Sequence, residues 1–412
     1  MKKNRKKNKI YGIFLFIFLL IAVVFVFIYF NLNIFKIPKE KRPLVKPKTI
    51  SANKLKIQYF KEHPVRATDI FFNGILKSLS ISRNNIIVQD INIDINIPAG
   101  DPENVKEIRL DYKKYNVLIS KNLDFNFIKN IIKSGFEKYI IPSGTNIRYF
   151  IYTVKNNCFC VYFYRKKTLF LKAVLLVRGK NNSGFNSIQG YVDAPKIALD
   201  IDDVGYDPSY IEKLVSLKIP VTFAIFPDAP FSKKLDIFLH KAGYETIIHM
   251  PMESIYPDLN PGDGSLYVTM NKKAIIKKLK KDLSKLPYIT GANNHEGSLF
   301  TSDQKKICEV VGFLKKKQLF FMDSLTDTKS FAYRCSLELG EPSIQRDVFL
   351  DDKPSLKYIR DQLKVAEKLS AKFKRVVVIA HPRLDTVEVL IKKLPAIKKE
   401  GYRFVPLCEF LR

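Results

Sequence analysis

From about residue 196 to the C-terminus, short apolar segments alternate regularly with segments of helical periodicity. The apolar segments predict strands at 196–202, 221–226, 245–250, 288–293, 319–323, 343–349, 375–380 and 402–406. In the segment 271–286 between two of them, apolar side chains recur at helical spacing and lysines fill the other face. Strands that alternate with helices over this length predict an α/β domain with a parallel sheet, either closed as a barrel or doubly wound.

Ionisable residues cluster where these predicted strands end. Three of the five histidines and several acids stand there: Asp202 and Asp203 end the first strand, His249 the third, His295 the fourth and Asp323 the fifth, and His381 follows the seventh. The carboxyl ends of parallel strands meet on one rim of a barrel, where barrel enzymes place their active sites. The coincidence therefore predicts a catalytic or metal site at this rim.

The residue types indicate the chemistry of that site. Aspartate and histidine together suit a divalent metal ion, with zinc as the first candidate. Three protein ligands that leave a position open would let such an ion activate water. The doublet Asp202-Asp203 can direct one carboxylate at the metal and leave the other to accept a proton.

Seven stretches, in order along residues 196–412, resemble the successive signatures of the divergent polysaccharide deacetylase family. They are KIALDIDDVGY, VTFAIFPDAP, IIHMPME, NNHEGS, LFFMDS, RDVFLDD and IAHPRLDT. The resemblance implies a distorted (β/α) barrel of seven or eight strands and metal-dependent removal of acetyl groups from a glycan. By the same resemblance, Asp202 is the catalytic base, Asp203 is a metal ligand and His381 is the general acid.

The metal motif departs from that of the related polysaccharide deacetylases, which carry two histidines four residues apart. Here the stretch is His249-Met-Pro-Met-Glu253, so a glutamate stands where the second histidine is expected. The third ligand is then either Glu253 or His295, and we favour His295 because it ends the next strand and adjoins a Gly-Ser turn. Asp323 is a further candidate, as a residue that orients a histidine.

Four other residues are candidates for contact with the substrate or a developing oxyanion: Asn294, Ser298, Arg346 and Asp347. For three of these the alternatives are structural. Asn294 can cap a turn, and Arg346 and Asp347 can form an ion pair. His240, late in the predicted helix 231–243, is expected to be structural.

The N-terminal half divides by composition. We expect a basic tail at 1–9, a transmembrane helix at 10–30, a Pro/Lys-rich linker at 31–55, a small α+β domain at 56–178 and a linker at 179–195. The uncharged run 10–30 is long enough to cross a bilayer and lacks a small-residue cleavage site. Within 56–178, we expect helices at 67–81 and 125–139, a strand at 91–97, and an antiparallel meander of 147–154, 158–164 and 168–177.

The formal net charge of +30 arises from basic residues spread along the chain rather than clustered. This dispersal argues against a nucleic-acid partner and favours attraction to an anionic envelope polymer or lipid surface.

The five cysteines contain no CxxC pair. Cys158 and Cys160 share one face of a strand, Cys308, Cys335 and Cys408 are expected as small core residues, and no disulfide framework is predicted.

Together these features predict a single-pass membrane protein with its N-terminus in the cytoplasm and its barrel outside, in the periplasm or at the cell surface. The barrel is expected to be a metal-dependent hydrolase that removes acetyl groups from an envelope glycan. The alternative is a catalytically inactive barrel that binds carbohydrate or serves envelope assembly. Nothing in the sequence indicates an oligomeric state.

Overall fold

The computed structural model describes residues 57, 59–98, 105–119, 124–154, 158–177, 188–262 and 264–412. The predicted basic tail, the predicted transmembrane helix at 10–30 and the predicted linker at 31–55 lie outside these residues. Among the described helices, none combines the length and the apolar character that a membrane span requires.

The chain forms two compact units. Of the described residues, the first unit comprises those up to Arg83 together with Asp124–Ile147, and the second comprises the others. The division between them runs through the segment 56–178, which the composition predicts as one small α+β domain.

The first unit is helical. Its main elements are α3 (Pro64–Ser78), α4 (Phe125–Gly135), the π-helical turn η2 (Phe136–Ile140) and the 3-10 turn η3 (Ile141–Ser143). Pro64 begins α3, where a missing N–H costs no helical hydrogen bond. Phe71 of α3 is fully buried and packs so closely on Gly135 that a Cβ there would lie 2.3 Å from the Phe71 ring. Both predicted helices are confirmed, with ends shifted by a few residues.

The second unit contains a five-stranded sheet. Its strands are β1 (Ile86–Pro98), β2 (Val105–Ile119), β3 (Ile147–Val154), β4 (Cys158–Arg165) and β5 (Thr168–Val177), in the order β1-β2-β5-β4-β3. β4 and β5 pair antiparallel as predicted, and the strand predicted at 91–97 is the central part of β1. β2 pairs parallel with β5, so the sheet extends beyond a simple meander.

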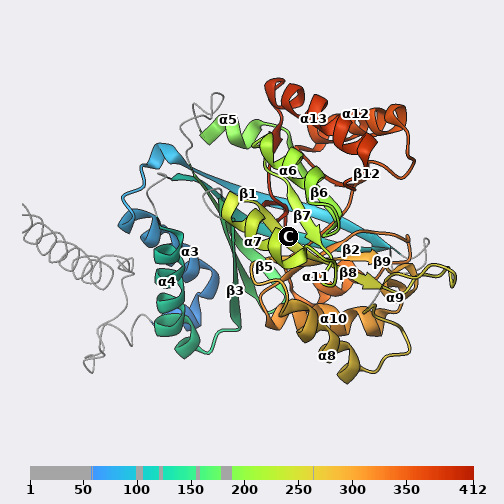
Figure 1. Ribbon diagram of the computed structural model, residues 1–412. Coiled ribbons are helices and arrows are strands. Elements are labelled where there is room, and N and C mark those ends of the chain that lie inside the picture. Colours follow the sequence, from blue (N-terminus) through green and yellow to red (C-terminus); the bar gives the residue numbers. More distant parts are fainter. Residues whose placement is uncertain are drawn as a thin grey trace, which may run out of the picture. The chain divides into compact units, whose positions relative to one another are not determined.

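The second sheet of this unit is parallel (Figure 1). Its strands are β6 (Lys196–Val204), β7 (Thr222–Ile225), β8 (Glu245–Met252), β9 (Gly291–Glu296), β10 (Phe320–Asp323), β11 (Ser343–Gln345), β12 (Val348–Phe349), β13 (Arg375–Ala380) and β14 (Arg403–Phe404). The order is β11-β10-β9-β8-β7-β6-β13-β12, and β14 pairs with β6. A strand stands at each of the eight predicted places, and the strand predicted at 343–349 is divided into β11 and β12.

That division makes the sheet curl. β11 pairs with β10 at one edge, β12 pairs with β13 at the other, and only Arg346 and Asp347 separate them in the chain. The Arg346 N–H donates to the Asp323 carbonyl at 3.1 Å, and the Asp347 N–H donates to the Val377 carbonyl at 2.9 Å. The two edges of the sheet therefore lie close together, as in a distorted (β/α) barrel.

Helices cover the outer face of the curled sheet. They are α6 (Pro208–Ser216), α7 (Ser232–Ala242), α8 (Lys272–Leu283), α9 (Ser298–Ser302), α10 (Gln304–Lys316), α11 (Ala332–Leu339), α12 (Leu356–Phe373) and α13 (Leu384–Lys399). α5 (Ile188–Asp193) occupies part of the predicted linker 179–195. Alternate strand residues such as Ile197, Leu199 and Ile201 pack on these helices in one apolar core.

A disulfide joins α10 to α11 through Cys308 and Cys335. Cys335 lies in the apolar core as predicted and Cys308 packs against it, but the expectation that the cysteines form no disulfide is wrong. Their Cα atoms lie 5.4 Å apart because α10 and α11 pack together, a contact that sequence spacing does not reveal.

The inner face of the curled sheet packs on the five-stranded sheet. Ala198, Ala224 and Ile247 of the parallel strands share a second apolar core with β3, β4 and β5 and with η4 (Leu407–Glu409). Tyr152 of β3, for example, meets Phe320 of β10 edge to face at 5.4 Å. This layer closes the amino-terminal side of the barrel, and the carboxyl ends of the strands remain free to carry a site.

Candidate active site

The site begins with a distortion of β6. Its pairing with β7 changes register between Ile201 and Val204, and Asp203 has a φ of +56°. Adjacent residues of a regular strand point to opposite faces, but a bulge with one left-handed residue can turn two neighbours to the same side. Asp202 and Asp203 both line one pocket as a result. A non-glycine residue in this conformation costs free energy and is typical of functional sites.

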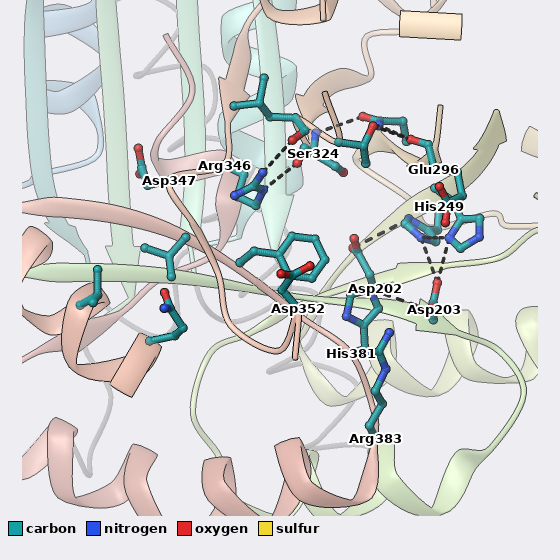
Figure 2. Close-up of a pocket in the computed structure, with 18 of the residues that line it drawn as sticks. Asp202, Asp203, His249, Glu296, Ser324, Arg346, Asp347, Asp352, His381 and Arg383 are labelled. Carbon is teal, nitrogen blue, oxygen red and sulfur yellow. Dashed lines mark hydrogen bonds and ion pairs between the residues drawn. The ribbon is translucent and has the colours of Figure 1, made fainter. Parts of the chain in front are cut away.

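Three ligand atoms meet beside this bulge. Asp203 Oδ1 lies 3.2 Å from His249 Nε2 and 3.1 Å from His295 Nδ1, and the two ring nitrogens are 3.0 Å apart (Figure 2). Ligands of one tetrahedral zinc ion, with bonds of about 2.0–2.1 Å, stand roughly 3.3 Å from one another. The three atoms therefore stand close to the arrangement that one such cation requires.

The hydrogen bonds around these atoms suit a cation. His249 Nδ1 lies 2.7 Å from Asn293 Oδ1, which can only accept, so Nδ1 carries a proton and Nε2 is the ring nitrogen that a cation would use as a ligand. Asp203 Oδ1 is buried and has no hydrogen-bond partner among the described residues apart from the two facing imidazoles. Phe226 packs edge to face on both histidine rings and holds their planes.

The electrostatics point the same way. Burial by itself would raise the pKa of the Asp203 carboxyl, but His249 and His295 hold it well below its usual range. Burial would lower the pKa of His249, but Asp202 and Asp203 raise it to about 9. The pocket therefore attracts positive charge at the point where the three ligand atoms meet. The donor set fits the divalent ion that the sequence predicts.

Asp202 stands next to this set without joining it. It is 3% exposed, and its Oδ1 accepts a hydrogen bond of 2.7 Å from Asn293 Nδ2. The same amide donates to Asp200 Oδ2 at 3.1 Å. Burial and the neighbouring Asp202 raise the pKa of Asp200 well above its ordinary value, which favours the protonated form of Asp200. Asn293 thus fixes the Asp202 carboxylate and the His249 ring at once.

His381 faces the pocket from the end of β13. It is 7% exposed, and its Nδ1 lies 2.9 Å from Asp351 Oδ1. Asp351 is itself fixed by Thr386 Oγ1 at 2.8 Å and by the His381 N–H at 2.9 Å. Burial would lower the pKa of His381, but Asp351 raises it above its ordinary value. The imidazolium form is favoured, with Nε2 turned toward the site, 3.9 Å from Asp203 Oδ2.

These groups open into a cavity of about 650 Å³, a size suited to a small ligand or a sugar unit. Figure 2 shows Asp202, Asp203, His249 and His381 close together on one side of the pocket, with Arg346 and Asp347 farther away. Its other lining residues include Asn294, Glu296, Ser324, Leu325, Thr326, Arg346, Asp347, Val348, Phe349, Asp352, Tyr358, Gln362, Val365, Leu369 and Arg383.

Two residues predicted as alternative ligands or supports lie elsewhere. Glu253 Oε2 accepts from the Val268 N–H at 2.7 Å and holds the loop that follows β8. Asp323 accepts from the Leu325 N–H at 2.9 Å and from Ser330 Oγ at 2.8 Å. Neither belongs to the cluster of ligand atoms, so the structure brings His295, and not Glu253, to Asp203 and His249.

Of the four predicted substrate residues, Asn294, Arg346 and Asp347 line the cavity and Ser298 does not. Asn294 and Ser298 tie loops together: Asn294 Oδ1 accepts from the Ser324 N–H at 3.0 Å, and Ser298 Oγ accepts from the Ile255 N–H at 2.9 Å. Arg346 and Asp347 form no ion pair with each other. The Arg346 guanidinium donates to the Ser324 and Leu325 carbonyls, and Asp347 accepts from the Val377 N–H at 2.7 Å.

The contacts of His240 agree with its predicted structural role. His240 stacks on Tyr288 with ring centroids 4.0 Å apart and has no part in the pocket, as expected. The N-terminus of α10 is capped by Asp303, whose side chain accepts from the Lys306 N–H.

Three residues of the site were not identified from the sequence as functional: Asp200, Asn293 and Asp351. Asp200 stands two residues before Asp202, a spacing that places both on the inner face of one strand. Asn293 pairs with His249 across β8 and β9. Asp351 follows the sixth predicted strand in the stretch RDVFLDD, so its strand-end position was the available signal.

Comparison with known proteins identifies the family to which the parallel-sheet part of the chain is similar. The profile of the divergent polysaccharide deacetylase family matches residues 201–411. An uncharacterised Escherichia coli K12 protein, YibQ, is 32% identical over 198 residues, which cover 48% of this chain and 61% of YibQ. An uncharacterised protein of Haemophilus influenzae is 31% identical over 203 residues, which cover 48% of this chain and 72% of the relative.

A solved structure agrees at the level of the fold. The crystal structure of an uncharacterised Agrobacterium tumefaciens C58 protein superposes with a TM-score of 0.50 at 20% identity, over 53% of this chain and 89% of that one. The chain spans 61% of the length of YibQ, the first of these relatives. From the match over 201–411, the chain belongs to the divergent polysaccharide deacetylase family.

Proposed function

We propose that the chain is a metal-dependent hydrolase that removes acetyl groups from an envelope glycan. The observation that carries this proposal is the convergence of Asp203, His249 and His295 on one point, flanked by Asp202 on one side and His381 on the other. A bound divalent cation, zinc in the first place, would polarise an acetyl carbonyl and lower the pKa of a coordinated water.

Two residues of the chain then carry out the two proton transfers. Asp202, held in place by Asn293, accepts a proton from the attacking water. His381, held as imidazolium by Asp351, donates a proton from Nε2 to the leaving amine or hydroxyl. The departing acetyl group is released as acetate. Asn293 and Asp351 do not react; they position the groups that do.

The site favours an enzyme over a binding module because it combines a proton acceptor with a proton donor. Asp202 is prepared to take a proton and His381 to give one, and a glycan-binding site needs neither. A carboxylate and an imidazolium poised on two sides of one ligand set are typical of acid–base catalysis.

Acetate release tests the function. The full-length chain, stripped of metal and then reloaded with Zn²⁺, is incubated with N-acetylated and O-acetylated oligosaccharides of the peptidoglycan and chitin type. We expect acetate release that depends on the metal. Binding of one of these glycans without any acetate release, in the reloaded protein, would favour the inactive, carbohydrate-binding alternative.

We further propose that residues 10–30 anchor the chain and that the barrel lies outside the cytoplasm. The apolar run supports the anchor, and the Cys308–Cys335 disulfide suits an oxidising compartment. Protease added to spheroplasts should digest the barrel while a cytoplasmic marker stays intact. Protection of the barrel under those conditions would reverse the orientation.

A further inference from the structure

Three cysteine thiols meet at the end of the barrel opposite to the candidate active site. Cys158 and Cys160 come from β4, and Cys408 comes from η4 near the C-terminus. Their sulfur atoms lie 3.9 Å apart for Cys158 and Cys160, 3.7 Å for Cys158 and Cys408, and 3.9 Å for Cys160 and Cys408. All three side chains are 0% exposed. None of them forms a disulfide.

The triangle of sulfurs has the size of a metal site. A point equidistant from three atoms at these separations lies about 2.2 Å from each, close to the ~2.3 Å of a zinc–thiolate bond. Two of the three cysteines stand two apart on one strand, and the third is about 250 residues away in the chain. Packing alone requires small apolar residues here, but it does not require three polarisable sulfurs within 4 Å of one another.

A buried lysine side chain lies within electrostatic range of Cys160. Lys172 is 3% exposed, and its Nζ donates to the main-chain carbonyls of Glu409 at 2.7 Å and Leu411 at 3.0 Å. Within the described residues, no carboxylate lies at ion-pair distance from it. A buried ammonium group is costly unless negative charge compensates it. Three thiolates at Cys158, Cys160 and Cys408 carry more negative charge than one monovalent or divalent metal ion neutralises. The remaining negative charge would provide that compensation.

The coordination number identifies the class of metal. Two buried acids lie near the thiols: Glu245 accepts from Thr222 Oγ1 at 2.7 Å and from the Cys408 N–H at 3.2 Å, and Glu409 accepts from the Tyr191 hydroxyl. Among the described residues, the sulfurs therefore have no fourth protein ligand. Zinc in structural sites takes four ligands, whereas the soft ion Cu(I), which thiolates also bind, is stable with three. We propose that Cys158, Cys160 and Cys408 form a buried three-thiolate site for Cu(I).

The position indicates a structural role for this site. Thr222 and Glu245 begin β7 and β8, so the thiols lie at the amino ends of the parallel strands, the side of a barrel that serves stability. A copper ion there would join the five-stranded sheet to the C-terminal residues. It would also keep three thiols from oxidising in a compartment where Cys308 and Cys335 are paired.

The experiment uses the full-length chain in detergent, produced in copper-supplemented medium and purified without oxygen in the presence of a Cu(I) chelator. Because the site is sealed, copper must enter during folding. We expect one copper per chain, with an X-ray absorption spectrum of Cu(I) bound by sulfur alone. Cys160→Ser should weaken Cu(I) retention by more than about 100-fold, since one ligand of three is lost.

Two variants serve as controls. The double variant Cys308→Ser/Cys335→Ser removes the other two cysteines and should keep the copper. The double variant His249→Ala/His295→Ala removes two residues of the candidate active site and should keep it as well. Circular dichroism shows whether each variant is folded, and the absorption spectrum of the unmodified chain tests the ligands without any substitution.

Three results would overturn the proposal. The first is a copper-free chain in which thiol titration finds Cys158, Cys160 and Cys408 all reduced. The second is a Cys158–Cys408 disulfide in the peptide map of the unmodified chain. The third is zinc rather than copper in the purified protein, or copper whose spectrum shows nitrogen or oxygen ligands.

Discussion

Asp351→Asn is the substitution that most sharply tests how the site handles protons. The change keeps the size of the side chain and removes the negative charge that lies 2.9 Å from His381 Nδ1. Asp351 is the main cause of the raised pKa of His381, with Asp202 and Asp203 contributing less. The variant should therefore lower this pKa while the metal ligands stay in place.

The magnitude follows from the geometry. An opposite charge in direct contact moves a pKa by roughly one to three pH units, and each unit is worth about 1.36 kcal/mol. Asp202 and Asp203 remain in the variant, so we expect a fall of about one to two pH units. A general acid works below its own pKa, so activity is lost as the pH rises through the pKa of His381. The alkaline limb of the profile should move to lower pH by that amount.

The assay is kcat/KM for acetate release from pH 5 to 10, measured for the parent protein and the variant. Asp347→Asn is the matched control: it removes another carboxylate of the cavity wall, one that accepts from the Val377 N–H and contacts no histidine. Its alkaline limb should stay in place. An alkaline limb that does not move in Asp351→Asn would refute the assignment of His381 as the acid.

Three further predictions concern metal and stability. His249→Ala and His295→Ala should each abolish stoichiometric zinc binding, measured by atomic emission after dialysis, while His240→Ala should not, because His240 stacks on Tyr288 away from the ligands. Glu253→Gln should retain zinc with unchanged affinity; loss of zinc would restore this residue as a ligand. Cys308→Ser/Cys335→Ser should lower the free energy of unfolding by about 3–4 kcal/mol, the usual effect of opening a loop of this length, and an unchanged urea midpoint would contradict this.

The positions of the strand ends could be predicted from the sequence, but the local backbone geometry at those ends could not. Hydrophobic runs locate parallel strands, and parallel strands bring their carboxyl ends together, so Asp203, His249 and His295 could be grouped without a structure. The bulge that turns Asp202 and Asp203 to one side depends on the register between β6 and β7, which no pattern in either strand encodes.

Contacts between residues far apart in the chain could not be predicted from the sequence either. The partnership of His381 with Asp351 joins residues 30 apart, and Cys408 meets Cys158 across 250 residues. The shared face of Cys158 and Cys160 followed from strand periodicity, but their third neighbour depends on how η4 returns beneath the barrel. The break of the strand 343–349 at Arg346 and Asp347 likewise depends on two different pairing partners, β10 and β13.

The central claim is that Asp203, His249 and His295 hold a divalent metal ion while Asp202 moves a proton. Metal content and acetate release, measured on the same preparations of the parent protein, Asp202→Asn and Asp203→Asn, test it most directly. We predict that Asp202→Asn keeps full metal occupancy and loses roughly 10²–10⁴-fold in turnover, whereas Asp203→Asn loses metal affinity as well. Parent-level turnover in Asp202→Asn, on a glycan that the parent hydrolyses, would contradict the account.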